Sequence, residues 1–337
     1  MRGSVTRDQG HSRRKMLDKN KPRVAVVIAT YGRPKSLSKV LESLRTQTLR
    51  PDRVVIVDAT PNATIDNPPF LQTKSDLKID YLVSGIGSLP AQKNLGIDFL
   101  KKNWDGDYVQ ILDDDTQPQP NFLELLSKTL KTQGDYVGVS GFFASDKPGF
   151  VTSVWEKKTG IARVKQTIFA VFGLDSRFPA IVTRGGVGTF SDLSASFADS
   201  QWLHGPAMWR YTIFDVVKYD PSLPGSALCE DLDFSLRALK HGNLATVGSA
   251  RIDHEMSLDH RPDWPLHYYR FARNRMVIFR ANGALDLRLA HYVLANVVVS
   301  ISLLAKYLAS PGDRSMLRAF CNVYKGMVDG FQNKPPK

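Results

Sequence analysis

Short runs of apolar residues alternate with amphipathic segments along the first half of the chain. Residues 24–29 and 54–57 are continuous runs rich in β-branched side chains, a pattern typical of strands buried on both faces of a parallel sheet. Between them, leucine and valine recur with helical spacing from residue 37 to residue 44. These three segments predict a βαβ unit, and Ser36 is the expected N-cap of its helix.

The same alternation continues to residue 139, and helical patterns return in the second half. We expect further strands at residues 78–83, 108–112, 136–139 and 250–253, and helices at residues 91–101, 120–130 and 230–241. Residues 144–200 follow neither period, and the chain after Trp264 has a mainly helical pattern. This order predicts an α/β fold with a mostly parallel sheet flanked by helices, followed by a C-terminal helical extension.

Composition describes a globular chain whose charge lies at its ends. Of the 337 residues, 42% are hydrophobic, which is enough to bury a sizeable core. Two cysteines, Cys229 and Cys321, are too few for a disulfide framework, so a reducing compartment is expected. Residues 1–23 carry +6 and residues 306–337 carry +4 of the formal charge of +12. The remaining body is nearly neutral, which argues against binding of nucleic acid by the folded surface.

Residues 289–305 are the sequence's candidate for a membrane span. These seventeen residues include no Lys, Arg, Asp or Glu. A span needs about 20 predominantly apolar residues, so we expect a buried or interface-lying helix instead. No signal peptide is expected, because the first apolar run is short and follows several charged residues, and residues 1–21 are interpreted as a mobile basic tail.

Polar residues follow three of the predicted strands. In open α/β sheets, ligands bind beyond the carboxyl ends of the strands, where loops and helix N-termini converge. The first predicted strand leads into residues 30–33, the second ends at Asp58, and a later strand runs into Asp113–Asp115. Neither a GxGxxG fingerprint nor a GxxxxGK[ST] loop follows the first strand, which argues against a dinucleotide dehydrogenase or a P-loop NTPase.

The three consecutive aspartates would repel one another unless a cation or solvent relieved them. Because alternate residues of an extended chain point the same way, Asp113 and Asp115 could share one hard divalent ion while Asp114 faces elsewhere. A solvated acidic turn before the next helix is the alternative. The position after a buried strand favours the metal site.

Two further candidates keep both a structural and a catalytic interpretation. Glu230 and Asp231 begin a predicted helix, where carboxylates stabilise the helix dipole. The same position would lower the pKa of a general base and keep it ionised. His254 follows a predicted strand and is either a hydrogen-bonded structural residue or a metal ligand.

Taken in order, these segments resemble the family 2 glycosyltransferases, which have the GT-A fold. The resemblance covers roughly residues 24–255, and the ordered set is more specific than any one member. A weaker similarity, at residues 268–275 and 325–330, is to non-processive bacterial members that build surface polysaccharides. The main matching segments are VVIATYGR (26–33), VIVD (55–58), AQKNLG (91–96), LDDDT (112–116), WLHGPAM (202–208), EDLDFSLR (230–237) and His254.

The resemblance implies a role for each matching residue. Asp231 would be the general base, with Glu230 beside it in the catalytic pair, and Trp202 and His204 would border the acceptor or donor sugar. Asp113 and Asp115 would form the DxD-type element that holds Mg²⁺ or Mn²⁺ against the diphosphate, and His254 would complete the metal shell. The residues implied in binding the nucleotide sugar are Thr30, Tyr31, Arg33, Asp58, Lys93, Asn94, Asp113, Asp114 and Asp115.

The implied reaction is the metal-dependent transfer of a sugar from a nucleotide diphosphate donor to a hydroxyl group of a glycan or lipid-linked acceptor. One base opposite the leaving group implies inversion at the anomeric carbon, whereas glycoside hydrolases use a pair of carboxylates. The chain lacks the QxxRW element and the multiple spans of processive polysaccharide synthases. We therefore predict the addition of one sugar, or a few, to each acceptor.

Two rival functions fit the sequence less well. A nucleotidyltransferase that makes sugar nucleotides should have a Gly-rich, Arg-containing phosphate loop after the first strand, but residues 30–33 contain one glycine. A nucleic-acid-binding protein should have its basic residues on the folded body. The dense basic group inside the body is Arg270, Arg273, Arg275, Arg280 and Arg288, which is either a solvated helix face or part of a membrane-binding surface.

The basic ends and the apolar C-terminal segment together predict association with a membrane. We expect residues 265–331 to lie against an anionic surface and to present a lipid-linked acceptor to the site. The expected location is the cytoplasm, peripheral on the inner face of the plasma membrane. The predicted organisation is a tail at residues 1–21, a catalytic domain at residues 22–264 and a helical region at residues 265–337.

Overall fold

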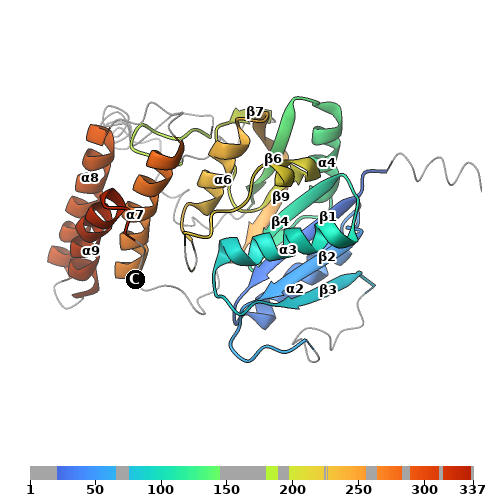
Figure 1. Ribbon diagram of the computed structural model, residues 1–337, viewed down its shortest axis with the longest axis horizontal. Coiled ribbons are helices and arrows are strands. Elements are labelled where there is room, and N and C mark those ends of the chain that lie inside the picture. Colours follow the sequence, from blue (N-terminus) through green and yellow to red (C-terminus); the bar gives the residue numbers. More distant parts are fainter. Residues whose placement is uncertain are drawn as a thin grey trace, which may run out of the picture.

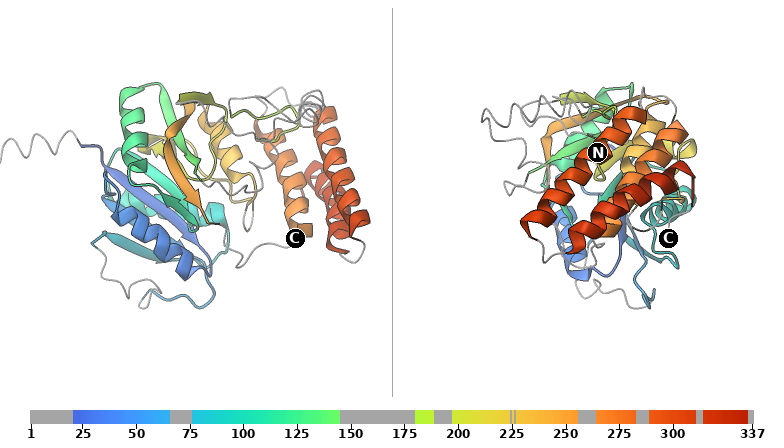
Figure 2. Two further views of the ribbon diagram at one scale, coloured as in Figure 1. Left: turned by 180° about the vertical axis from the view of Figure 1, so that it is seen from behind. Right: turned by 90° about the vertical axis from the view of Figure 1, so that its left-hand side faces the viewer.

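The fold is known from a computed structural model, which describes residues 21–65, 76–144, 180–188, 197–223, 225, 227–255, 264–282, 289–310 and 314–334. A sheet with helices on both faces forms one part of the molecule, and three C-terminal helices pack together at one end of it (Figure 1). Two further views show the same arrangement (Figure 2). Residues 1–20 of the predicted tail lie outside the described residues.

In the described residues, nine strands form one mixed sheet. They are β1 (Val24–Thr30), β2 (Arg53–Asp58), β3 (Ile79–Val83), β4 (Tyr108–Asp113), β5 (Thr116–Pro118), β6 (Tyr136–Phe143), β7 (Phe197–Ser200), β8 (Ala207–Arg210) and β9 (Asn243–His254). The order is β3-β2-β1-β4-β8-β6-β9-β5, and β7 also pairs with β9. Strand β1 is parallel to its neighbours β2 and β4, and β2 is parallel to β3. Strand β8 is antiparallel to both β4 and β6.

Alternate residues of β1 pack into two separate hydrophobic cores. The even-numbered residues from Val24 to Ile28 pack with helices α2 and α4, and the odd-numbered ones pack with α3 and α6 on the opposite face. Because successive side chains of a strand point to opposite faces, a strand between two helical layers must be apolar at every position. The helices are α2 (Pro34–Arg45), α3 (Leu89–Asn103), α4 (Phe122–Thr132) and α6 (Glu230–Ala238).

The structure confirms the predicted α/β architecture and corrects it locally. Helix α2 begins at Pro34, so Ser36 lies inside the helix and is not its N-cap, which is Arg33. Proline is favoured in the first turn because its missing N–H would be unpaired there. Part of the segment expected to be irregular forms β7, while residues 145–179 and 189–196 lie outside the described residues. Strands β5, β7 and β8 escaped prediction because three or four residues are too few to show a period.

Three helices form the C-terminal extension, as predicted. They are α7 (Trp264–Asn282), α8 (Leu289–Ala309) and α9 (Arg314–Phe331). Two glycines of α9 allow its backbone to approach α7: an added Cβ at Gly326 would lie 2.3 Å from the carbonyl oxygen of Tyr269, and one at Gly330 would lie 2.9 Å from that of Arg273. Larger side chains would force the helices apart. The shared core contains Ala272, Leu303, Ala319 and Val323.

Helix α8 is longer than the apolar run that identified it. It has 21 residues, because its last turn continues to Ala309, and it is the one helix in the described residues that is long and apolar enough to cross a membrane. The expectation that this segment is too short for a span was therefore wrong in its length. Its exposed apolar side chains are Leu289, Val293, Ile301, Leu304 and Leu308.

The expected basic surface after residue 264 is also corrected. Arg273 and Arg275 are each 2% exposed, so they belong to neither a solvated face nor a membrane-facing one. They point to different sides of α7, and each side is covered by a neighbouring segment: Arg273 contacts Lys334, and Arg275 contacts Gly185 and Asn296. Arg288 lies outside the described residues.

Candidate active site

The carboxyl ends of three parallel strands bring the predicted polar residues together. In the register of the sheet, Thr30 of β1 lies beside Asp58 of β2, and Ala29 of β1 lies beside Asp113 of β4. Gln92 of α3 fixes this edge, because its side-chain amide donates hydrogen bonds to the carbonyl oxygens of Thr30 (2.9 Å) and Val57 (2.8 Å). No pattern in the sequence indicated a role for Gln92, although it belongs to the AQKNLG segment.

The middle aspartate of the triplet points back into the sheet edge, as expected. Asp114 is buried, and it accepts hydrogen bonds from the Thr30 hydroxyl (2.7 Å) and the Arg33 guanidinium (3.0 Å). Burial raises the pKa of Asp114 to about 6, against the lowering effect of Arg33. Asp114 therefore orders the loop after β1 and leaves its neighbours to face the site.

Asp115 and His254 meet because β5 pairs with β9. Thr116 lies opposite His254 in this antiparallel pair, and the His254 Nε2 is 3.3 Å from Asp115 Oδ1. The second Asp115 oxygen is 3.4 Å from Arg33. This carboxylate and imidazole are donors that suit a divalent ion. Within the described ranges, however, no group of three or more His, Cys, Asp or Glu side chains is arranged to hold a metal.

Asp113 instead faces Lys93 and the loop before β8. Its Oδ1 is 3.9 Å from the Lys93 ammonium. An added Cβ at Gly205 would lie 2.7 Å from Asp113 Oδ2, so a larger residue there would require this carboxylate to shift. Gly205 is a second residue whose role the sequence did not reveal, although it lies in the WLHGPAM segment.

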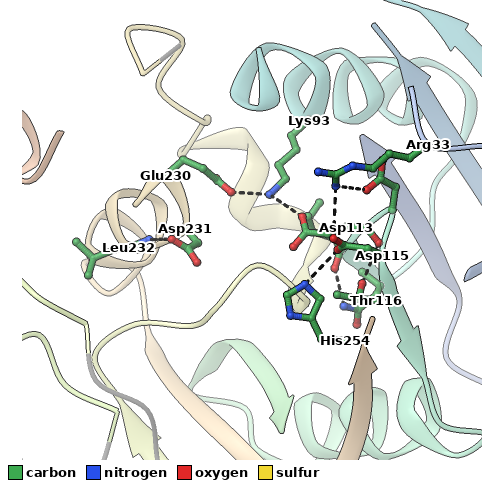
Figure 3. A network of polar contacts seen from close by, with 12 residues as sticks. Arg33, Lys93, Asp113, Asp115, Thr116, Glu230, Asp231, Leu232 and His254 are labelled. Carbon is green, nitrogen blue, oxygen red and sulfur yellow. Dashed lines mark hydrogen bonds and ion pairs between the residues drawn. The ribbon is translucent and has the colours of Figure 1, made fainter. Parts of the chain in front are cut away.

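Lys93 connects the strand ends to helix α6 (Figure 3). Its ammonium group is 2.6 Å from Glu230 Oε1, and the side chains of Lys93 and Glu230 are 1% and 6% exposed. Burial by itself would lower the pKa of Lys93, but Glu230 and Asp113 raise it, so Lys93 is a buried cation. Burial raises the pKa of Glu230 to about 7 despite this cation. The arrangement places one positive charge among carboxylates from two different elements.

Asp231 lies in the first turn of α6, and its side chain points toward the side of the site that holds Asp113 and His254 (Figure 3). One of its oxygens accepts a hydrogen bond from the Leu232 backbone N–H (2.8 Å). Burial raises the pKa of Asp231 to about 6, while Lys93 lowers it. The expectation that the helix start keeps this pKa low was therefore wrong, because desolvation outweighs the N-terminal dipole.

The remaining nucleotide-site candidates have mixed surroundings. Tyr31 is an exposed aromatic side chain beside Gly87. Asp58 is buried and accepts hydrogen bonds from Tyr81 (2.7 Å) and from the backbone of Thr60 (2.7 Å). Asn94 exchanges hydrogen bonds of 2.8 and 3.0 Å with the backbone of Tyr219.

The contacts of Lys93 and Asn94 give both residues a structural role beside the implied one. The side chain of Asn94 holds the chain segment at Tyr219, and Lys93 is buried against Glu230. Both residues therefore support the position of neighbouring segments, and their contact with the nucleotide sugar stays a prediction.

The two residues implied in sugar binding lie at different depths. Trp202 is buried in a cluster that includes Leu223 and Leu232. His204 is held through Nε2 by the carbonyl oxygen of Gly141 (2.8 Å), and burial lowers its pKa to about 4. His204 is thus a neutral imidazole at the edge of the site.

Phe143, at the end of β6, joins the two histidines. Its ring centroid lies 4.6 Å from that of His204 and 5.4 Å from that of His254. No periodic signal in the sequence marked Phe143. Its place between the two imidazoles depends on the pairing of β6 with β9.

Comparison with known proteins agrees with this geometry. Residues 25–184 match the model of the glycosyl transferase family 2. A relative from Bacillus subtilis (strain 168), described as the uncharacterized glycosyltransferase YwdF, is 29% identical over 235 residues, which cover 70% of this chain and 75% of the relative. The chain therefore contains a glycosyl transferase family 2 domain and is a distant homologue of a bacterial glycosyltransferase, and its mixed sheet flanked by helices is consistent with the GT-A fold.

Proposed function

We propose that this glycosyltransferase moves a sugar from a nucleoside diphosphate donor to a hydroxyl group of a glycan or lipid-linked acceptor, with inversion at the anomeric carbon. One observation carries the proposal: Asp231 lies on α6 across from Asp113, Asp115 and His254, and Lys93 joins the two sides. A base on one side and a set of diphosphate-side ligands on the other are what a direct displacement requires.

The donor side of the site is formed by the loop after β1 and by the strand end at β4. Arg33 is partly exposed and lies within reach of Asp115, so it can also contact a phosphate of the donor. Tyr31 offers an exposed ring to the nucleoside. The hydrogen bonds described above hold these groups in place, and they are made by Thr30, Asp58 and Asp114.

The residues present fit a divalent ion held jointly with the donor. Mg²⁺ in such sites is bound through one or two carboxylates and by phosphate oxygens of the substrate. Asp115 and His254 would provide two protein ligands, and Asp113 would join them by turning away from Lys93. When bound, Mn²⁺ or Mg²⁺ would stabilise the negative charge of the departing diphosphate.

Asp231 takes the proton of the acceptor hydroxyl while the oxygen of that hydroxyl forms a bond to the anomeric carbon. The bond from that carbon to the diphosphate oxygen breaks at the same time, and its electron pair leaves with the nucleoside diphosphate. A general base of this kind contributes about 10²–10⁴-fold in rate. Because the pKa of Asp231 is about 6, the group is mainly ionised at neutral pH and still basic enough to accept a proton.

The decisive experiment replaces Asp231 by Asn. We expect Asp231→Asn to abolish donor turnover and to leave binding of the nucleotide with Mn²⁺ nearly unchanged, because the substitution removes only the base. A panel of UDP-, GDP- and dTDP-linked sugars is first screened for hydrolysis and thermal stabilisation with Mn²⁺, and the best donor is used for calorimetry. Substantial turnover in Asp231→Asn would refute the base assignment.

The metal is tested separately by binding. Calorimetric titration of the same donor with and without Mn²⁺ should show weaker binding in EDTA, and His254→Ala and Asp115→Asn should reduce the difference. Equal affinity with and without the ion would refute the proposed metal dependence.

We also propose that the C-terminal helices place the enzyme on the inner face of the plasma membrane. Apolar side chains are exposed along α8, and Leu317, Tyr324, Val328 and Phe331 form a similar stripe on α9. Basic residues accompany these stripes at Lys306, Arg314, Arg318 and Lys325. Each basic residue near an anionic surface contributes about 1 kcal/mol.

Flotation with anionic liposomes tests the membrane proposal. Ile301→Asp combined with Leu308→Asp should abolish flotation, because both side chains are exposed on α8. Val216→Asp is the matched control, since Val216 is equally exposed but lies on the sheet-containing part. Absence of flotation in the wild-type protein, or equal flotation of all three proteins, would contradict the proposal.

A further inference from the structure

Helix α7 reaches the backbone that leads into α6. Asn274 is fully buried, and its side-chain amide donates a hydrogen bond to the carbonyl oxygen of Leu228 (3.0 Å). The next residue, Cys229, has φ of +72°, in the left-handed region that non-glycine residues rarely adopt. Such a conformation persists only where the surrounding structure holds it. Cys229 is followed directly by Glu230 and Asp231, so Asn274 helps to fix the point from which α6 starts.

A second asparagine of α7 contacts the first turn of α6. Asn282 is buried, and its amide donates a hydrogen bond to Asp233 Oδ1 (3.1 Å). Asp233 is also buried and accepts a hydrogen bond on its other oxygen from Arg237 Nε (3.1 Å). Asp233 lies two residues after Asp231 on the same helix. The hydrogen bond from Asn282 therefore limits how α6 can rotate or slide.

Apolar packing fills the space between these two hydrogen bonds. Ile278 of α7 lies between the two asparagines in sequence and belongs to the same buried cluster as Leu232 and Leu236 of α6. The helix that contacts α6 in this way is also the helix on which α9 packs most closely. The position of α6 thus depends on the C-terminal helices as well as on the sheet.

We propose that Asn274 and Asn282 are positioning residues of the transferase: they hold the start of α6 so that Asp231 faces the acceptor hydroxyl. This inference rests on the proposed role of Asp231 as the base. The C-terminal helices are then part of the catalytic unit and not a detachable anchor. A base must lie within hydrogen-bond reach of the proton that it removes, and a misplacement of about 1 Å can reduce the rate about 10²-fold.

The test measures kcat and KM in Asn274→Ala, Asn274→Asp and Asn282→Ala. Asn274→Asp keeps the shape of the side chain but removes the donor to Leu228. We expect kcat to fall roughly 10–100-fold in each variant. The KM for the donor and the calorimetric affinity for donor with Mn²⁺ should stay within about twofold, because those groups lie on the sheet edge. A purely structural role would not separate kcat from donor binding in this way.

Tyr269→Phe is the matched control on the same helix. It removes one hydrogen bond, from the Tyr269 hydroxyl to Asp329 Oδ2 (2.9 Å), but on the side of α7 that contacts α9. We expect its kcat to be unchanged. Thermal unfolding identifies which variants are folded, and either asparagine position suffices for the test. An unchanged kcat in the folded asparagine variants, or an equal loss in Tyr269→Phe, would overturn the inference.

Asp231→Asn, measured in parallel, separates this inference from the proposed function. Turnover that survives Asp231→Asn would refute the base itself. Loss of turnover in Asp231→Asn, together with normal kcat in the folded asparagine variants, would refute only the positioning role.

Discussion

Charged side chains are buried in two regions of the molecule, and the regions satisfy them differently. At the carboxyl edge of the sheet, cations meet buried carboxylates, as the buried Lys93 meets Glu230 and the partly exposed Arg33 meets Asp114. In α7, Arg275 donates to the carbonyl oxygens of Phe271 and Gly185 and to the side chain of Asn296. It forms no ion pair with any residue that the structure describes.

The difference separates charges that can respond to substrate from charges that fix packing. The ionised groups of the sheet edge change their energy when a proton, a cation or a diphosphate arrives, because they interact with one another through a poorly solvated site. The guanidinium of Arg275 is held by neutral acceptors from three segments, and burial lowers its pKa only from a very high starting value. Its function is to join α7, α8 and the segment at Gly185.

The largest expected effect is at Lys93. Lys93→Met leaves Glu230 buried without its cation, and breaking a buried pair in this way costs about 3–5 kcal/mol of unfolding free energy. Turnover should also be lost. In the double variant with Glu230→Met, most of the stability should return because no buried charge is left alone, but turnover should stay low. Urea unfolding and donor turnover measure the two effects, and a loss of stability below about 1 kcal/mol in the single variant would contradict the comparison.

A smaller effect is expected at Arg275. Arg275→Met leaves neutral acceptors without donors but leaves no buried charge unpaired. The expected loss is therefore about 1–3 kcal/mol of unfolding free energy. Turnover of the folded protein should change less than about twofold, because the hydrogen bonds of Arg275 go to Phe271, Gly185 and Asn296, which belong to neither α6 nor the donor side. Arg275→Lys keeps the charge without the planar fork and should recover only part of the stability. A loss of turnover that exceeds the loss of stability would place Arg275 with the catalytic residues.

The pH profile gives the smallest and most specific effect. The base acts when deprotonated, so kcat/KM should fall as pH drops below about 6, the pKa of Asp231, by about tenfold for each further pH unit. Because Lys93 lowers this pKa, any residual activity of Lys93→Met should have its acid limb at higher pH. Glu230→Gln serves as the control, and its profile of kcat/KM against pH should retain the acid limb. Loss of the limb in Glu230→Gln would assign it to Glu230.

The sequence predicted an element correctly where its own hydrophobic pattern and the patterns of the adjacent segments indicated the same fold. The β1 and β2 runs and the α2 period were readable because a strand between two helical layers must be apolar throughout. The ordered polar residues at the strand ends predicted one site for the same topological reason. The sequence did not predict the hydrogen-bond partners of Lys93 and Asn94, because a side chain's partner depends on which distant segments pack beside it, and both partners lie more than 100 positions away.

The prediction that the arginines of the C-terminal region form an exposed basic surface failed for a related reason. Helical spacing distinguishes the faces of a helix only when the buried face is apolar. Arg273 and Arg275 are buried on different sides of α7, and their long side chains donate hydrogen bonds to carbonyl oxygens that no pattern of charge can reveal. The length of α8 was underestimated because the last turn includes Lys306, which ends an apolar run but not a helix.

The sequence by itself determined the α/β class, the order of the longer strands and helices, the resemblance to a glycosyltransferase family and the group of residues around which the site forms. These follow from periodicity and from motifs that are local in the chain. Only the tertiary structure decided that Lys93 joins Glu230 to Asp113, that the pKa of Asp231 is raised, and that α7 contacts the start of α6. Each of these depends on burial and on contacts between remote segments, and burial is a property of the packed molecule.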